Sequence, residues 1–147
     1  MSSFSSDMAI AKTKALQVTD RAVKNTILRM CKEVINETPV DTGRLKNNWY
    51  ASNRAFGVRT TKATDPSGKN SMNRVRAALK RLKRGQSFYF FNNLVYAPVV
   101  EFGRYPNPPK NPTGKTINGF SRQAPQGMLR KNFNLVELYF AQQRGKF

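Results

Sequence analysis

The spacing of apolar residues predicts a long helix near the start of the chain. Five large apolar side chains between residues 16 and 34 recur at steps of seven, four, three and four, so they share one helical face. Ser6 or Asp7 can cap its start, and Thr38 ends it because the residue before Pro39 avoids helical backbone angles. A helix of about 30 residues is roughly 45 Å long, so we expect its N-terminal end to project. The stripe consists of Leu16, Val23, Ile27, Met30 and Val34.

A short helical turn and a strand are predicted next. Asp41 stands where an N-cap is expected, with Val40 before it and Leu45 after it in the positions of a hydrophobic staple. From residue 49 to residue 61, apolar side chains at alternating positions favour a strand. Residues 60–71 are turn formers throughout, so we expect them to form a mobile loop.

A basic helix is predicted from residue 72 to residue 84. Ser71 can cap it, and Gly85 stops it. An aromatic strand follows at residues 87–93, and its adjacent aromatic side chains point to both faces of a sheet. Helices can cover one face, and we expect a second subunit to meet the other.

The last third of the chain predicts two helices separated by an irregular loop. Residues 96–103 read as a short helical turn with a proline near its start and a glycine past its end. Residues 104–119 contain four prolines and two glycines, which is typical of a long loop. The final helix is predicted from residue 125 to residue 143. Its apolar stripe consists of Leu129, Phe133, Val136 and Phe140.

Composition narrows the chemistry that this chain can perform. Its 147 residues fit a single domain, and 26 Lys and Arg against 8 Asp and Glu give a net charge of +18. The absence of His excludes Ser-His and Cys-His nucleophile pairs and imidazole metal ligands. Cys31 is the one cysteine, so no intramolecular disulfide is possible. No apolar run approaches the ~20 residues of a membrane span. We therefore expect a protein made in the cytoplasm. We also expect it to use no cofactor.

The basic residues point to a polyanionic or acidic partner. The predicted helix 72–84 is basic around most of its circumference, and such a field attracts nucleic acid and acidic proteins alike. No recognised DNA-reading motif is present, which favours an acidic protein neighbour. Only eight carboxylates are present, and Asp41 is better explained as a cap and Glu101 as the partner of a nearby Arg than as a catalytic pair. The candidate basic surface consists of Arg74, Arg76, Lys80, Arg81, Lys83 and Arg84.

Three segments, in order, carry a resemblance to a known family. They are residues 38–49 (TPVDTGRLKNNW), residues 90–103 (FFNNLVYAPVVEFG) and residues 123–130 (QAPQGMLR). This order resembles the tail-completion proteins of the neck of tailed bacteriophages, the group of the minor tail protein Z type. The positions that match are Asp41, Thr42, Gly43, Leu45, Trp49, Asn92, Tyr96, Ala97, Glu101, Gly103, Ala124, Pro125, Gly127, Met128 and Arg130.

The resemblance implies a structural virion protein that is not an enzyme and has no small-molecule substrate. Relatives form a ring, expected to be a hexamer, between the tail terminator and the head-side connector or stopper, and genomic DNA passes through its lumen. The implied fold is α+β: a long N-terminal helix and a C-terminal helix packed on a small antiparallel sheet, with extended basic loops. Residues 1–15 would form an arm, and the loops 60–71 and 104–120 would become ordered in the assembly.

The motif residues have plausible structural roles. Asp41 would cap, Asn92 and Asn93 would close the strand, and Tyr96 and Trp49 would fill the layer between sheet and helix. Glu101, partly buried, would need a cation, either Arg130 or Arg44.

Two other functions stay open. A basic nucleic-acid-binding module would bind duplex DNA with a steep salt dependence and remain monomeric or dimeric. A metal-dependent nuclease is a weaker alternative, because the sequence contains no compact cluster of carboxylates.

Overall fold

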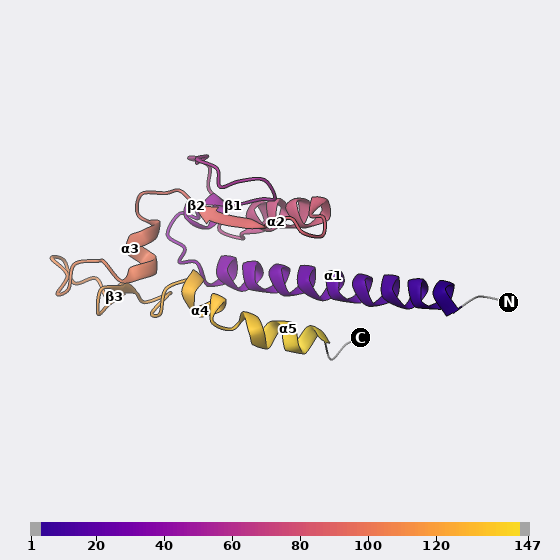
Figure 1. The fold of residues 1–147 in the computed structure, drawn as a ribbon. Coiled ribbons are helices and arrows are strands. Elements are labelled where there is room, and N and C mark those ends of the chain that lie inside the picture. The colour runs from indigo at the N-terminus through magenta and orange to yellow at the C-terminus, as the bar shows by residue number, and fades with distance from the viewer. Residues whose placement is uncertain (1–3, 145–147) are drawn as a thin grey trace.

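A single long helix runs through the middle of the molecule. The structure is a computed structural model that describes residues 4–144. Helix α1 (Phe4–Glu37) is 34 residues long, which confirms the predicted helix and its end before Thr38. Its N-terminal part extends beyond the other elements, and the side chains of residues 6–14 are exposed (Figure 1). The expected projection is therefore confirmed.

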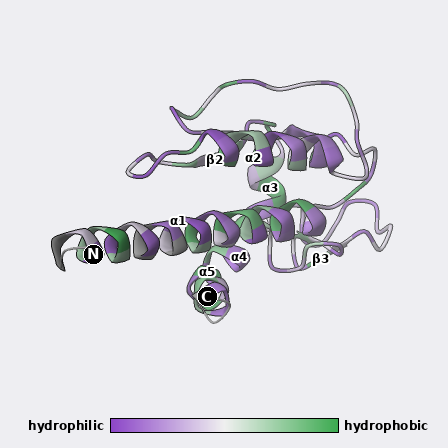
Figure 2. Ribbon diagram, turned by 90° about the vertical axis from the view of Figure 1, so that its right-hand side faces the viewer, coloured by the Kyte–Doolittle hydropathy of each residue, from purple (hydrophilic) through white to green (hydrophobic). Residues whose placement is uncertain are grey.

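The chain has an α+β fold in which α1 separates two layers. The helix α2 (Lys69–Arg81) and the sheet lie on one side of α1, and the C-terminal helices α4 (Leu129–Phe133) and α5 (Val136–Arg144) lie on another side (Figures 1 and 2). The core forms where these layers meet, around the fully buried Val34, Ile35 and Val75.

The central sheet is a pair of short antiparallel strands, β1 (Trp49–Ser52) and β2 (Tyr89–Asn92). Trp49 lies in the core, stacks on Phe90 with ring centroids 4.6 Å apart, and donates from Nε1 to the Thr38 hydroxyl at 2.8 Å. This confirms its expected place between sheet and helix.

The first strand is shorter than predicted. It ends at Ser52, whose hydroxyl accepts hydrogen bonds from the backbone N–H groups of Arg54 and Ala55 and so turns the chain. Phe56 and Val58, which were expected to continue the strand, are 67% and 93% exposed. The alternation of apolar residues in the sequence continues past Ser52. The strand nevertheless ends there, because the Ser52 hydroxyl takes backbone N–H groups that would otherwise pair with a neighbouring strand.

The outer face of this sheet is partly covered by the chain itself. The ring of Phe56 packs edge-on against Tyr89 at 4.8 Å, and the guanidinium of Arg74 lies 4.2 Å from the ring of Tyr50. The second subunit expected on this face stays a prediction.

The basic helix begins earlier and ends earlier than predicted. α2 starts at Lys69 after Gly68, and it ends at Arg81 rather than at Arg84. Ser71 is buried inside the helix and donates to the Lys46 carbonyl at 2.7 Å, so the expectation that it caps the helix is wrong. Asp65 provides the cap instead, because its carboxylate accepts from the backbone N–H of Asn70 at 2.8 Å.

The segment from Tyr96 to Ser121 combines a predicted helix with a hairpin that was not predicted. α3 (Ala97–Phe102) begins with a proline in its first turn and ends at Gly103 in the left-handed conformation, as expected. The loop that follows contains a small antiparallel pair, β3 (Thr116–Ile117) and β4 (Phe120–Ser121), joined by two positive-φ residues at 118 and 119.

The C-terminal helix is broken. The single helix expected from 125 to 143 is instead α4 and α5, separated by Asn134 and Leu135. Asn132 is buried at the join, where its amide donates to the Met128 carbonyl and accepts from the Tyr139 hydroxyl at 3.0 Å. Phe133, placed in the predicted stripe, is 62% exposed. The hydrogen bonds of the buried Asn132 thus hold this region together where a continuous apolar stripe was expected.

Candidate functional site

Glu101 joins two of the three segments that carry the family resemblance. Its carboxylate accepts hydrogen bonds from the backbone N–H groups of Met128, Leu129 and Arg130 at 2.7, 2.8 and 2.9 Å. The first N–H groups of a helix have no partner inside the helix, and the helix dipole favours a negative charge at this end. Glu101 therefore caps α4 from a different element, and we call this arrangement the Glu101 cap.

Arg130 completes the Glu101 cap. Its Nε donates to the Glu101 carboxylate at 3.1 Å, and its Nη2 donates to the Glu101 backbone carbonyl at 3.0 Å. Its guanidinium also lies 4.6 Å from the ring of Phe102. Of the two cations considered, Arg130 is confirmed, whereas Arg44 directs its Nε to the Thr61 carbonyl.

The hydrogen bonds of the cap determine the charge state of Glu101. Burial acts to raise its pKa, but the donors from Leu129, Arg130 and Met128 outweigh burial, so the pKa lies below its ordinary value. The carboxylate is therefore ionised and bonded at neutral pH, which does not suit a general acid. Its role is to hold α3 and α4 together.

Gly127 lets these two elements approach each other. Its φ of +81° is a conformation that suits glycine, and a Cβ atom here would lie 2.6 Å from the Glu101 carbonyl oxygen. Of the neighbouring motif residues, Ala97, Ala124 and Met128 belong to the buried core, while Pro125 is exposed.

The first motif segment forms a tight turn against the loop 60–68. The Gly43 carbonyl accepts from the backbone N–H of Asn47 at 3.0 Å and from that of Asp65 at 3.1 Å. A Cβ atom on Gly43 would lie 2.5 Å from the backbone nitrogen of Pro66. Leu45 is buried in the core at the end of the turn.

Asp41 does not cap a helix, so that expectation is wrong. The helical turn is the 3-10 helix η1 (Lys46–Asn48), which starts several residues later and has Leu45 in its N-cap position. Asp41 is exposed, and so is Thr42, whose hydroxyl accepts from the backbone N–H of Arg44 at 3.2 Å. A local hydroxyl bond and the Gly43 carbonyl form this turn instead.

Two buried asparagines that we did not single out hold the loop 60–71 in place. Asn48 donates to the Thr61 carbonyl at 3.0 Å and accepts from its N–H at 2.9 Å, and Asn47 donates to the Ala63 carbonyl at 3.1 Å. The loop that was expected to be mobile is tied down in the single chain. The signal was available: two amides stand between the core residues Leu45 and Trp49, where polar side chains need partners.

The strand-closing asparagines lie as expected, but Tyr96 does not. Asn92 donates to the Leu45 carbonyl at 3.0 Å, and Asn93 donates to the Gly57 carbonyl at 2.9 Å. Tyr96 is 37% exposed rather than buried in the layer between sheet and helix, so its expected role is wrong. It follows the exposed Val95 on a surface turn, at the rim of a hollow of about 770 Å³ that Asp41 also lines.

Two of the six candidate basic residues have partners within the chain, and the other four are exposed. Arg74 is half-buried and donates to the backbone carbonyls of Asn47 and Trp49 at 2.6 and 2.9 Å, so placing it on the basic surface was wrong. Arg84 pairs with Asp20 of α1 at 2.7 Å. The other four are exposed on α2 or just after its end: Arg76, Lys80, Arg81 and Lys83.

Two kinds of reactive site can be examined in the described residues, a nucleophilic thiol and a metal centre. Cys31 is fully buried, and burial raises the pKa of its thiol to about 12, so the nucleophilic thiolate is not formed at neutral pH. Between residues 4 and 144, no three Cys, Asp or Glu side chains lie together in a way that could hold a metal ion. Over the same range, no helix combines the length and apolar character of a membrane span.

Comparison with protein families, with curated proteins and with solved structures found no match to this chain. The resemblance to tail-completion proteins therefore rests on the quoted sequence segments alone.

Proposed function

We propose that this chain is a structural protein of the bacteriophage neck, a tail-completion ring that joins the tail terminator to the head-side connector and lets DNA pass. In this role the protein acts in the virion, is assembled in the cytoplasm of the bacterial host, and works by complementary docking. It catalyses no reaction.

The observation that carries this proposal is the Glu101 cap. The polar groups of the residues that resemble the family motifs form hydrogen bonds with each other. The Glu101 carboxylate accepts from the backbone N–H groups of residues 128–130, and the Arg130 side chain donates to Glu101. A catalytic site keeps polar groups available for a substrate. Groups used in this way instead support a rigid shape that can be presented repeatedly around a ring.

Two separate surfaces suit a ring. Ring closure requires two different patches on each subunit. The projecting end of α1 is one, because apolar positions continue along it and Met8 and Ile10 are 56% and 53% exposed (Figure 2). A hollow of about 480 Å³ between α1 and α5, lined by Val23 and Phe140 among others, is the second. A neighbouring copy of the chain would place its projecting helix end there.

Purified phage particles provide a test of this role. We expect peptides of this chain to be recovered from infectious particles of the phage that encodes it, in a fixed copy number matching one ring. We also expect a nonsense mutation in its gene to leave heads and tails that do not join. Quantitative peptide mass spectrometry measures the first, and electron microscopy of the mutant lysate measures the second.

The control for this test is expression of the intact gene from a plasmid, which should restore joined particles. Absence of the chain from infectious particles would contradict the proposal, and so would normal joining in the mutant.

The charge of the chain keeps a nucleic-acid-binding module as the second candidate. The net charge of +18 and the exposed cations at the end of α2 would bind duplex DNA with a steep salt dependence. A nucleic-acid-binding module does not need to form a ring. The oligomeric state of the purified chain therefore distinguishes it from the tail-completion protein.

A further inference from the structure

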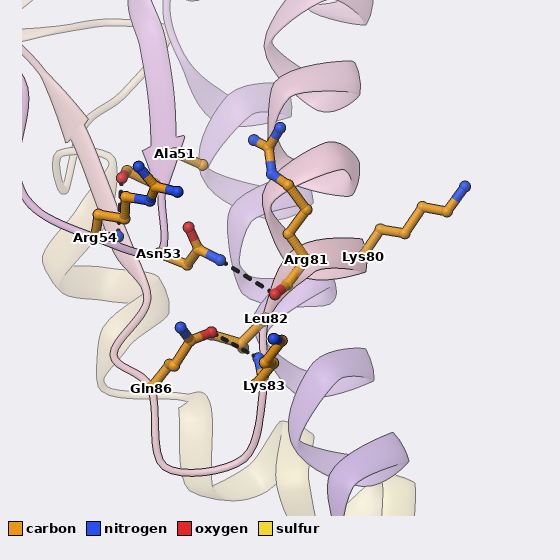
Figure 3. Close-up of a pocket in the computed structure, with 9 residues that line it drawn as sticks. Ala51, Asn53, Arg54, Lys80, Arg81, Leu82, Lys83 and Gln86 are labelled. Atoms are coloured by element: carbon orange, nitrogen blue, oxygen red, sulfur yellow. Dashed lines mark hydrogen bonds between the residues drawn. The ribbon is translucent and has the colours of Figure 1, made fainter.

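A hollow lined by cations lies between the end of β1 and the C-terminal end of α2. It has a volume of about 720 Å³, and Figure 3 shows Arg54 on its β1 side and Arg81 across from it on α2. Lys83 and Lys80 also line it, with the Lys80 ammonium directed away from Arg54 at the outer edge (Figure 3), and none of the lining residues is acidic. We call this hollow the basic groove.

Hydrogen bonds within the chain hold the walls of the basic groove. The Asn53 amide donates to the Arg81 carbonyl at 3.2 Å, which ties the end of β1 to the end of α2. The Gln86 side chain accepts from the backbone N–H of Lys83 at 2.8 Å, which closes the turn after α2. Both bonds are drawn in Figure 3. The groove is thus formed before any partner arrives, which lowers the entropy cost of binding.

The four cations of the groove lack a counter-charge in the part of the chain that the structure describes. The ion pairs found there join Asp20 to Arg84, Glu101 to Arg130 and Glu37 to Lys131. The carbonyl end of the α2 dipole offsets the groove charge only in part, since it amounts to about half an elementary charge. Like charges in one hollow repel each other, and an anionic ligand would relieve that repulsion.

We propose that the basic groove binds an extended acidic segment of a neighbouring protein in the assembled neck. This inference deepens the proposed docking function and rests on it. Arg54 and Arg81 can each hold a carboxylate through two parallel hydrogen bonds, and the lysines add point charges. Ala51 and Leu82, which are half-buried, give the groove an apolar part for the aliphatic side chains of such a segment.

The size of the groove favours a peptide over duplex DNA. A sphere with the volume of the basic groove is only about 11 Å across. A DNA duplex is wider than this, because its major groove alone is about 12 Å wide. A duplex could therefore touch the rim with a few phosphates but could not enter. The side chains of an extended peptide reach into such a hollow without this restriction.

A charge-matched pair of variants tests this inference. The groove variant replaces Arg54, Lys80, Arg81 and Lys83 with Gln. The control variant replaces Lys32, Lys62, Lys110 and Lys115 with Gln, all of them exposed, outside the groove and away from the projecting end of α1. The two variants have the same net charge. Between residues 4 and 144, none of the ion pairs involves a groove cation or a lysine of the control variant, so we expect both variants to unfold close to the temperature of the wild-type protein.

The probe is a fluorescein-labelled decaglutamate peptide, measured by anisotropy at physiological salt, with a short DNA duplex as a second probe. We expect the groove variant to bind decaglutamate about tenfold more weakly, and the control variant to stay within about threefold of wild type. Equal weakening in both variants would overturn the inference, because net charge alone would then explain binding. A larger loss of duplex binding than of peptide binding in the groove variant would also overturn it, in favour of DNA.

Native mass spectrometry of the same samples separates this inference from the ring proposal. A wild-type chain that forms no ring but binds decaglutamate through the groove would contradict the ring and uphold the groove. A wild-type ring, together with a groove variant that binds decaglutamate as tightly as the control variant does, would uphold the ring and contradict the groove.

Discussion

Glu101→Ala is expected to lower the free energy of unfolding by about 3 kcal/mol. The substitution removes the acceptor for three backbone N–H groups at the start of α4 and leaves Arg130 without its carboxylate. Hydrogen bonds to a charged group contribute more than neutral ones, and donors left without a partner add a desolvation cost. Urea unfolding followed by circular dichroism measures the change.

Glu137→Ala is the matched control, because it removes a glutamate from the first turn of α5 at an exposed position. We expect a change within about 0.5 kcal/mol. Acid provides a second check. The pKa of Glu101 is lowered in the folded chain, so its contribution is present above its ordinary value of 4.5 and disappears as the pH falls through the lowered folded value. The difference between wild type and Glu101→Ala should shrink in that range, and a constant difference would contradict the role of the charge.

Gly43→Ala is expected to cost about 3 kcal/mol and to release the loop 60–68. The residue has a φ of +91°, and its new Cβ would lie 2.5 Å from the Pro66 nitrogen and 2.8 Å from the Asp65 carbonyl carbon. These are backbone atoms, which cannot rotate away as the end of a flexible side chain can. The loop would have to separate from the turn, and hydrogen exchange at Asp65 N–H reports that event.

Gly85→Ala separates backbone strain from steric overlap. Gly85 has a φ of +83°, close to that of Gly43, but nothing lies within 4 Å of its Cβ position. We expect it to cost about 1 kcal/mol, the strain of the left-handed conformation alone. If both substitutions cost the same, the packing of the motif turn against the loop contributes nothing measurable.

The elements that periodicity predicts well are those with an uninterrupted apolar face. α1 contains the predicted stripe from residue 16 to residue 34 and ends at Glu37 before Thr38, and α3 ends at Gly103 as its proline and glycine indicate. The need of Glu101 for a cation could also be inferred, because a partly buried carboxylate among apolar neighbours requires one. That Arg130 provides it, and that three backbone donors join it, depends on tertiary contacts across 27–29 residues.

The errors arise where polar side chains replace apolar packing. The C-terminal helix breaks because Asn132 is buried and pairs with Tyr139, a contact that a stripe of apolar residues does not reveal. Asp65 rather than Ser71 caps α2 because the loop before it folds back onto Gly43. The β3–β4 hairpin is different: Asn118-Gly119 is a sequence signal for a tight hairpin turn, and it was available in the loop.

The most direct test of the central claim is the mass of the purified full-length chain under native conditions. We expect a closed ring, a hexamer according to the family resemblance, that forms without DNA or any added cofactor. A chain that remains monomeric or dimeric at every concentration, and that binds duplex DNA with a steep salt dependence, would contradict the account.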